Sequence, residues 1–298
     1  MTAAPASTVA PPPAMPTRAR RRRTPALWLI APSIVFMTLM FAYPMLVGIG
    51  EAFTGPDGFT LEHIQRMVAD PYFWPAVRNT ALLIVVLIPL QFVLALTMAL
   101  MLRAKPRFSG LYFFLWAVPL AVSDLAAGLV WLAVFTDQGY LNSVLADLHL
   151  PTFSWLNYQN YGTMFLTVVI AELWRATALV FVILVAGLQS IPKDYEEAAA
   201  VFGAGTWARL RYVTLPLLRP SLQVALILRT ILAFQTFAVA QALTGQNFPL
   251  IVGETYRWST ALQNPNVASA IALVVMLASM ITAVFYLRLL RDQSEAKT

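Results

Sequence analysis

A polar segment between two apolar stretches carries the residues whose types and spacing best indicate a specific interaction. It reads Glu-Ala-Ala-Ala at 197–200, reaches Gly203 three residues later, and closes at Leu215 and Pro216. Alanine is a strong helix former, and an acidic side chain is favoured in a first helical turn. The pattern therefore predicts a short helix that turns sharply at Gly203. A charged helix with a low side-chain profile suits docking of a soluble partner.

Polar side chains inside apolar stretches form a second candidate site, because such groups usually face a cavity or a partner. Asp124 and Trp131 share one helical face, which places a carboxylate beside an indole, a pairing suited to a sugar. Farther along, one stripe is made of Thr230, Phe234, Phe237 and Gln241. We expect this stripe to line a substrate pathway, with plain helix packing as the alternative.

Three further charged residues lie in the same apolar stretches. Glu172 and Arg175 are three residues apart, so they can neutralise each other or contact substrate. Arg229 can contact a phosphate on the substrate, or it can bind Asp124 or Glu172 across the bundle. The sequence leaves these alternatives open.

Several kinds of chemistry are excluded. The chain has no cysteine, and His63 and His149 lie far apart, so we expect no metal site and no thiolate nucleophile. No Gly-x-x-x-x-Gly-Lys-Ser/Thr phosphate loop is present, so this chain should hydrolyse nothing and have no catalytic residues. The formal charge of +6 reflects membrane topology, and we expect no nucleic-acid partner.

The composition places the chain in a lipid bilayer. Of its 298 residues, 59% are hydrophobic and 11% charged, which is outside the range of soluble domains. The long apolar runs are continuous, unlike the alternating strands of a membrane β-barrel. Stretches of about 20 apolar residues cross a bilayer as helices. Six are predicted, at 27–50, 77–102, 109–135, 162–190, 219–244 and 267–290.

Arginine and lysine concentrate in alternate connections, which predicts that both termini are cytoplasmic. We divide the chain into a disordered basic tail at 1–24, a transmembrane domain at 25–291 and a short tail at 292–298. The polar segment is a cytoplasmic loop at about 191–219.

At this loop the chain resembles the permease subunits of binding-protein-dependent ABC importers. Their signature is Glu-Ala-Ala, three residues, Gly, nine residues, then an aliphatic residue, any residue and Leu-Pro. Every spacing is kept by Glu197-Ala198-Ala199, Gly203, Val213 and Leu215-Pro216. The most similar group is the carbohydrate group, of the maltose and glycerol-3-phosphate type. One departure is Phe202, where that group usually has aspartate.

The resemblance implies an all-α integral membrane fold, with six transmembrane helices and a cytoplasmic coupling-helix loop, as in the transmembrane domain of type I ABC importers. It implies that the loop docks on an ATPase, so that ATP-driven closure alternates access to a pore. The implied coupling residues are Glu197, Ala198, Ala199, Gly203, Leu215 and Pro216.

The same resemblance implies the partners and the location. The partners are a second homologous permease, a cytoplasmic ABC ATPase dimer, and an extracytoplasmic solute-binding protein or lipoprotein. ATP and Mg would sit on the ATPase, with no cofactor bound by this chain. The location is the inner or plasma membrane of a prokaryotic cell, where a di- or oligosaccharide or a glycerol-phosphate-type solute would be imported.

Six spans also suit a secondary transporter of small polar solutes. Such a transporter usually has an inverted repeat and its own ion-coupling site, and we find no convincing repeat between the halves. A channel needs a filter-like re-entrant segment, and none stands out. An intramembrane enzyme lacks a plausible catalytic centre here.

Overall fold

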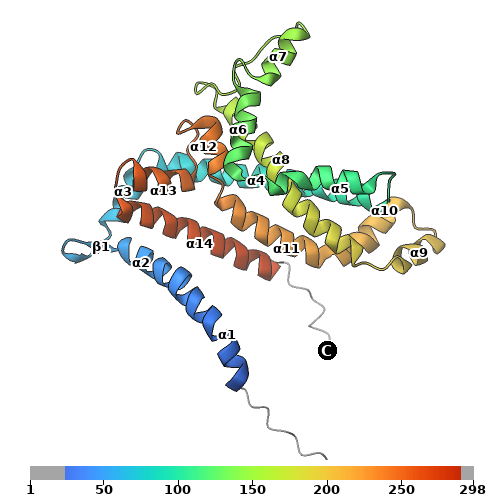
Figure 1. Cartoon of the computed structure of the whole chain (residues 1–298), viewed down its shortest axis with the longest axis horizontal. Coiled ribbons are helices and arrows are strands. Elements are labelled where there is room, and N and C mark those ends of the chain that lie inside the picture. The colour runs from blue at the N-terminus through green and yellow to red at the C-terminus, as the bar shows by residue number, and fades with distance from the viewer. Residues whose placement is uncertain (1–23, 290–298) are drawn as a thin grey trace, which may run out of the picture. The chain divides into compact units, whose positions relative to one another are not determined.

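The computed structural model describes residues 24–289, and the chain divides after Val47 into two compact units (Figure 1). The predicted tails at 1–24 and 292–298 therefore lie outside the described residues, except for Thr24. The first unit contains α1 (Thr24–Met37), the π-helical turn η1 (Thr38–Ala42) and the start of α2 (Tyr43–Glu51). The three elements form one continuous helical segment, and its part at 29–51 is long and apolar enough to span a membrane.

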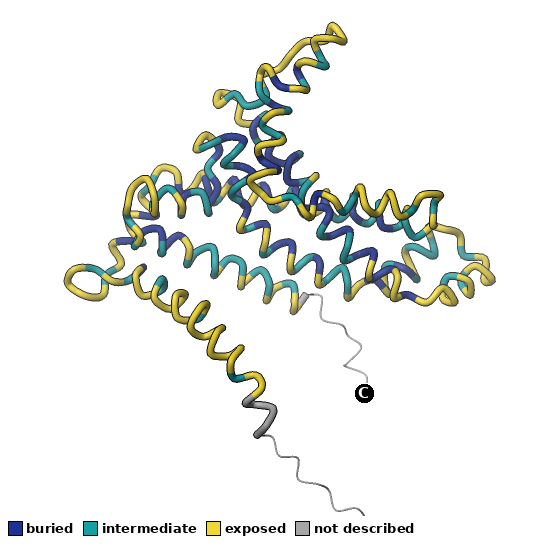
Figure 2. Tube along the Cα trace, viewed as in Figure 1, coloured by how far each residue is buried: buried dark blue, intermediate teal, exposed yellow. Residues whose placement is uncertain are grey.

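The second unit is built around four long helices. They are α4 (Phe73–Arg103), α8 (Tyr161–Gln189), α11 (Leu215–Phe234) and α14 (Pro265–Leu289). α4 packs along α8, and α11 lies between α8 and α14. Buried residues concentrate on α8, whereas the outer faces are exposed, as expected for surfaces that meet lipid (Figure 2).

The third predicted span, at 109–135, is not one helix. α5 (Ser109–Ala117) continues into the 3-10 turn η2 (Val118–Ala121), and α6 (Asp124–Phe135) leaves at a bend of 104°. Two local signals explain the break. Pro119 lies in the turn, and the Ser123 hydroxyl caps α6 by accepting from the backbone N–H of Ala126 at 3.2 Å. α6 and α7 (Tyr140–Asp147) rise away from the long helices (Figure 1).

The fifth predicted span, at 219–244, is also wrong as a single helix. α11 ends at Phe234, and a separate helix, α12 (Ala238–Thr244), follows. The last turn of α11 tightens, because the N–H of Gln235 bonds to Leu232 and that of Thr236 bonds to Ala233. Phe237 then takes an extended φ of −145°.

The remaining short elements lie at opposite ends of the bundle (Figure 1). At one end are the hairpin of β1 (Thr54–Gly55) and β2 (Gly58–Phe59), α3 (Glu62–Ala69) and α13 (Ile251–Thr260). At the other end are α9 (Asp194–Val201), α10 (Thr206–Arg209) and the π-helical turn η3 (Leu210–Thr214). Across the described residues, five single helices can span a membrane, and the bent pair beginning at α5 makes a sixth span if counted as one.

Close contact between α8 and α11 depends on Gly187. A Cβ at this position would overlap the Ser221 hydroxyl and lie 2.6 Å from the Ser221 Cβ and 2.9 Å from a Leu218 methyl. Small residues at such contacts let helix backbones approach in membranes.

We expect Gly187→Ala to destabilise the protein by about 1–3 kcal/mol, since the added methyl overpacks this contact. The measurement is the thermal unfolding midpoint of the full chain in mild detergent. Gly110→Ala is the control, because a Cβ there meets nothing within 4 Å. Equal midpoints for the two variants would contradict this packing.

Candidate functional site

The centre of the bundle holds a network of buried charges. Glu172 on α8 lies 3.1 Å from the Arg175 guanidinium and 3.2 Å from the Arg229 guanidinium of α11. The side chains of Glu172 and Arg229 are each 1% exposed. A buried ion is costly unless it is paired, and here one carboxylate contacts two cations.

Gln91 on α4 completes the buried part of the network. Its carbonyl oxygen accepts from Arg229 Nε at 2.7 Å, and its amide donates to the backbone carbonyl of Glu172 at 3.2 Å. Three membrane-spanning helices are therefore joined at one point. Between the two predicted carboxylate partners, Arg229 therefore pairs with Glu172, and its contact with a substrate phosphate stays a prediction.

Asp124 connects the network to the broken helix. It is the first residue of α6, and its carboxylate lies 2.7 Å from Arg175. Asp124 is half exposed, whereas the Arg175 side chain is 18% exposed. Arg175 therefore pairs with two carboxylates, the buried Glu172 and Asp124 beside the bend. The second pair links the start of α6 to α8.

A cavity of about 300 Å³ opens against this network. Asp124, Arg175 and Arg229 line it, together with Thr236 from the break after α11. Two buried polar atoms around it have no hydrogen-bond partner among the described residues, namely Arg175 Nε and Thr236 Oγ1. Buried polar groups are rarely left without partners, so a polar ligand fits this cavity.

The other predicted pathway residues are placed differently. The Trp131 ring stacks on Phe135 at 5.3 Å and meets Trp174 edge-on at 6.1 Å, and its indole N–H bonds to no described residue, Asp124 included. Thr230 is buried with no partner for its hydroxyl among the described residues, and Phe234 is half-buried on the last turn of α11.

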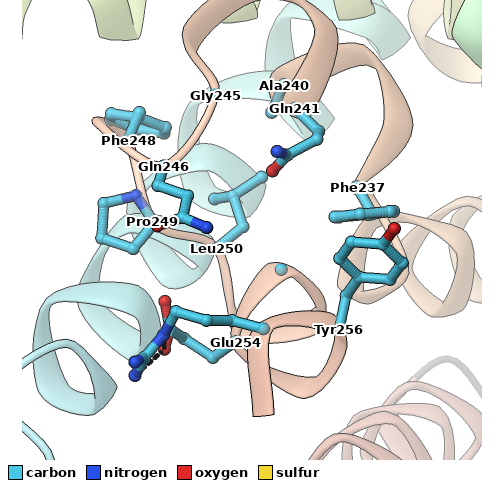
Figure 3. Close-up of a pocket in the computed structure, with 12 residues that line it drawn as sticks. Phe237, Ala240, Gln241, Gly245, Gln246, Phe248, Pro249, Leu250, Glu254 and Tyr256 are labelled. Atoms are coloured by element: carbon cyan, nitrogen blue, oxygen red, sulfur yellow. Dashed lines mark hydrogen bonds and ion pairs between the residues drawn. The ribbon is translucent and has the colours of Figure 1, made fainter. Parts of the chain in front are cut away.

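Phe237 and Gln241 line a second, much smaller pocket of about 20 Å³ (Figure 3). The Phe237 ring packs against Tyr256 of α13 at 5.2 Å. The predicted stripe of four residues is therefore divided by the break at 235–237 and does not line one surface.

An ion-pair cluster adjoins this second pocket. Arg257 of α13 contacts Glu254 at 2.6 Å and Asp70 at 2.7 Å, and it lies 4.9 Å from the centre of the Tyr72 ring. Burial raises the pKa of Glu254, although its bond to Arg257 acts in the opposite direction. Burial lowers the pKa of Arg257, but hydrogen bonds to Asp70 and Glu254 outweigh it and leave that pKa above its ordinary value.

The predicted polar loop forms two short helices, α9 and α10. α9 ends in a Schellman motif: the N–H of Gly203 bonds to Ala200 and the N–H of Ala204 bonds to Ala199, each at 2.9 Å. Gly203 has a φ of +80°, and a Cβ there meets nothing within 4 Å in this chain. The glycine is thus required by backbone conformation rather than by packing within the chain.

Three apolar side chains of this loop are strongly exposed. Val201, Phe202 and Trp207 are 86%, 90% and 70% exposed. Leu215 and Pro216 begin α11, Ala199 is partly buried, and Glu197 and Ala198 are exposed. Because the three exposed apolar groups lie on the polar loop, they are candidates for a contact with another protein.

Residues 91–294 of the chain match the family described as binding-protein-dependent transport system inner membrane component. The match includes the polar loop and all of the central charge network. The chain belongs to this family. It is therefore a multi-pass membrane protein, and it is the pore-forming permease subunit of an importer rather than a secondary transporter.

Individual relatives agree with the family. The permease is 30% identical to the sulfoquinovosyl glycerol transport system permease protein SmoG of Agrobacterium fabrum, over 90% of this chain and 91% of that one. It is 31% identical to the trehalose transport system permease protein SugA of Mycobacterium tuberculosis, over 74% and 73%.

A solved structure supports the fold. A bacterial alginate ABC transporter, in complex with an alginate pentasaccharide-bound periplasmic protein, contains a chain that matches with a TM-score of 0.76. The match covers 91% of this permease and 95% of that chain at 20% identity. It confirms the predicted fold of an ABC importer membrane subunit.

Sequence reasoning missed two parts of the permease. The role of Gln91 was not predicted, because its partners Arg229 and Glu172 lie on other helices and no local pattern in the sequence connects them. Glu196, rather than Glu197, makes the internal contacts of the loop: it lies 3.2 Å from Arg103 at the end of α4 and accepts from Thr214 at 3.0 Å. Arg103 also donates to the carbonyl of Leu188 at the end of α8. The run of three acids in the first turn of α9 was the available signal.

Glu172→Gln should destabilise the permease by about 3–5 kcal/mol, because it leaves Arg229 buried without a counter-charge. The measurement is the unfolding midpoint in detergent. The control is Glu62→Gln, which removes an exposed partner of Arg66 and should change stability by less than about 1 kcal/mol. A loss no larger than that of the control would show that Glu172 does not compensate Arg229.

Proposed function

We propose that this permease forms one half of the pore of an ATP-driven carbohydrate importer. The named relatives transport sulfoquinovosyl glycerol and trehalose, which supports a carbohydrate as the substrate class, with a glycerol-phosphate-type solute as the alternative. The observation that carries the proposal is the loop of α9 and α10, where the family's Glu-Ala-Ala and glycine spacing coincides with a large exposed apolar surface.

In this proposal the exposed surface docks on a cytoplasmic ABC ATPase dimer, which holds ATP and Mg. Ala198 and Ala199 give α9 a low profile, Glu197 pairs with a basic group of the ATPase, and Gly203 ends the helix in its left-handed turn. Leu215 and Pro216 start α11, which carries the movement to Arg229. ATP hydrolysis takes place on the partner, and this chain binds no cofactor itself.

The remaining partners follow from the same assignment. A second homologous permease completes the pore, and an extracytoplasmic solute-binding protein or lipoprotein delivers the sugar. A periplasmic protein is part of the alginate transporter complex, which supports this partner. The α9 end then faces the cytoplasm of a prokaryotic cell, as do both termini, and the α3 and α13 end faces outward.

We assign the cavity beside the charge network to the substrate pathway. Asp124, Arg175 and Thr236 supply carboxylate, guanidinium and hydroxyl groups, which are the groups that bind sugar hydroxyls. Phe237 and Gln241 line the small pocket in Figure 3, and we assign them to an outer part of the pathway that would have to widen for a sugar to pass. As the paired permeases rotate, the cavity opens alternately to the outer and the cytoplasmic side of the membrane.

The coupling surface is tested by Glu197→Lys and Trp207→Ala. We expect each variant to lower substrate-stimulated ATPase activity of the purified transporter at least tenfold, because each removes a contact with the ATPase. Glu62→Lys is the control, because it makes the same charge reversal on α3, at the end of the helix bundle opposite α9. If Glu197→Lys leaves transport and ATPase stimulation unchanged, its coupling role is wrong.

The substrate pathway is tested by Thr236→Val, which removes a hydroxyl at nearly constant volume. We expect uptake to fall about tenfold, since one lost hydrogen bond to substrate is worth roughly 1–3 kcal/mol. The measurement is the initial uptake rate in whole cells for trehalose, maltose and glycerol 3-phosphate. The control is Thr177→Val, a buried hydroxyl equally without a partner that lines a separate apolar pocket. Equal effects would remove Thr236 from the pathway.

A further inference from the structure

A cavity of about 280 Å³ lies where α4 and α8 end, beside the start of α9. The substrate pathway does not use it, because none of its lining residues belongs to the charge network. One wall is apolar and comes from Ala99, Leu102, Val185, Leu188 and Ile191. The cavity is therefore open to an apolar group of considerable size.

The remaining lining residues are polar, and three are basic. Arg103 is already engaged, with Glu196 at 3.2 Å and the carbonyl of Leu188 at 3.1 Å. Lys105 and Lys193 are exposed, and neither ammonium has a hydrogen bond or ion pair with another described residue. Two unpaired cations at the edge of an apolar wall are complementary to an amphiphile with an anionic head.

The backbone places the two lysines where they flank the cavity. Lys105 follows the last turn of α4 in the left-handed conformation, with a φ of 49°, and its N–H bonds to Leu102. Lys193 immediately precedes α9. Neither lysine lies on a regular helical face, so their approach to one cavity depends on these two chain reversals.

The depth of the cavity matches the membrane interface. α4 ends at Arg103 and α8 ends at Gln189, and both helices are long and apolar enough to span the bilayer. Phospholipid headgroups lie at the ends of spanning helices, and basic pockets between such helices bind anionic headgroups. The assignment to the cytoplasmic leaflet rests on the proposed function.

We propose that this cavity binds an anionic phospholipid. Its phosphate lies between Lys105 and Lys193, and the first part of an acyl chain covers the wall formed by Leu102, Val185 and Leu188. A free phosphate would satisfy the lysines but leave this wall bare, which favours the lipid as the source of the anion. The lipid ties the start of α9 to the end of α4, beside the Arg103–Glu196 pair.

The test is native mass spectrometry of the full chain, purified in mild detergent and titrated with phosphatidylglycerol or with phosphatidylcholine of the same acyl chains. We expect phosphatidylglycerol to be retained at least tenfold better. The double variant Lys105→Gln with Lys193→Gln should lose this preference, and Lys105→Arg with Lys193→Arg should keep it.

The control is Arg107→Gln with Arg211→Gln, which removes the same charge from exposed residues outside the cavity. Equal loss in the control would overturn the site in favour of general charge attraction. Equal retention of both lipids, or displacement of phosphatidylglycerol by millimolar inorganic phosphate, would overturn the lipid as occupant. The measurement needs neither ATPase nor sugar, so its failure leaves the proposed transport function untouched.

Discussion

Compensation of buried charge is the constraint on which the rest of this permease depends. Arg229 is almost fully buried among membrane-spanning helices, where an unpaired cation costs free energy. Glu172 and Gln91 supply its partners from two other helices, so α4, α8 and α11 cannot shift independently without breaking a bond. Arg175 extends the same network to Asp124 at the helix break. The pore wall is thus organised by a few polar contacts, while the apolar residues around them fill space.

The class of protein, most of the spanning helices and the position of the polar loop could be predicted from the sequence because each depends on local signals. Long apolar runs require helices in lipid, and the spacing from Glu197 to Pro216 is contiguous along the chain. The resemblance to ABC importer permeases is confirmed by the family match. The roles of the loop residues remain predictions, since they concern contacts with another protein.

The helix breaks and the pairing of charges were harder to predict, for different reasons. At Pro119 and Ser123 the sequence contains a turn former and a cap, but continuous hydrophobicity from 109 to 135 concealed them. At Gln235–Phe237 there is neither glycine nor proline, so the break depends on packing between distant helices. The same holds for Arg229, because its choice of Glu172 over Asp124 depends on how α11 faces α8. The contact of Trp131 with Trp174 of α8 likewise depends on how two helices face each other.

The Arg103–Glu196 pair gives the loop a mechanical connection to the membrane. Arg103 and Gln91 lie on the same helix, separated by twelve residues or roughly 18 Å of helical rise. A helix is stiff over this length, so in the proposed coupling mechanism a displacement of α9 would be transmitted along α4 as rigid-body motion. α8 is bonded at the same two levels, because the Leu188 carbonyl accepts from Arg103 and Glu172 accepts from Arg229. In the proposed mechanism, α4 and α8 would together transmit a movement of the loop to the buried Arg229 without local unfolding.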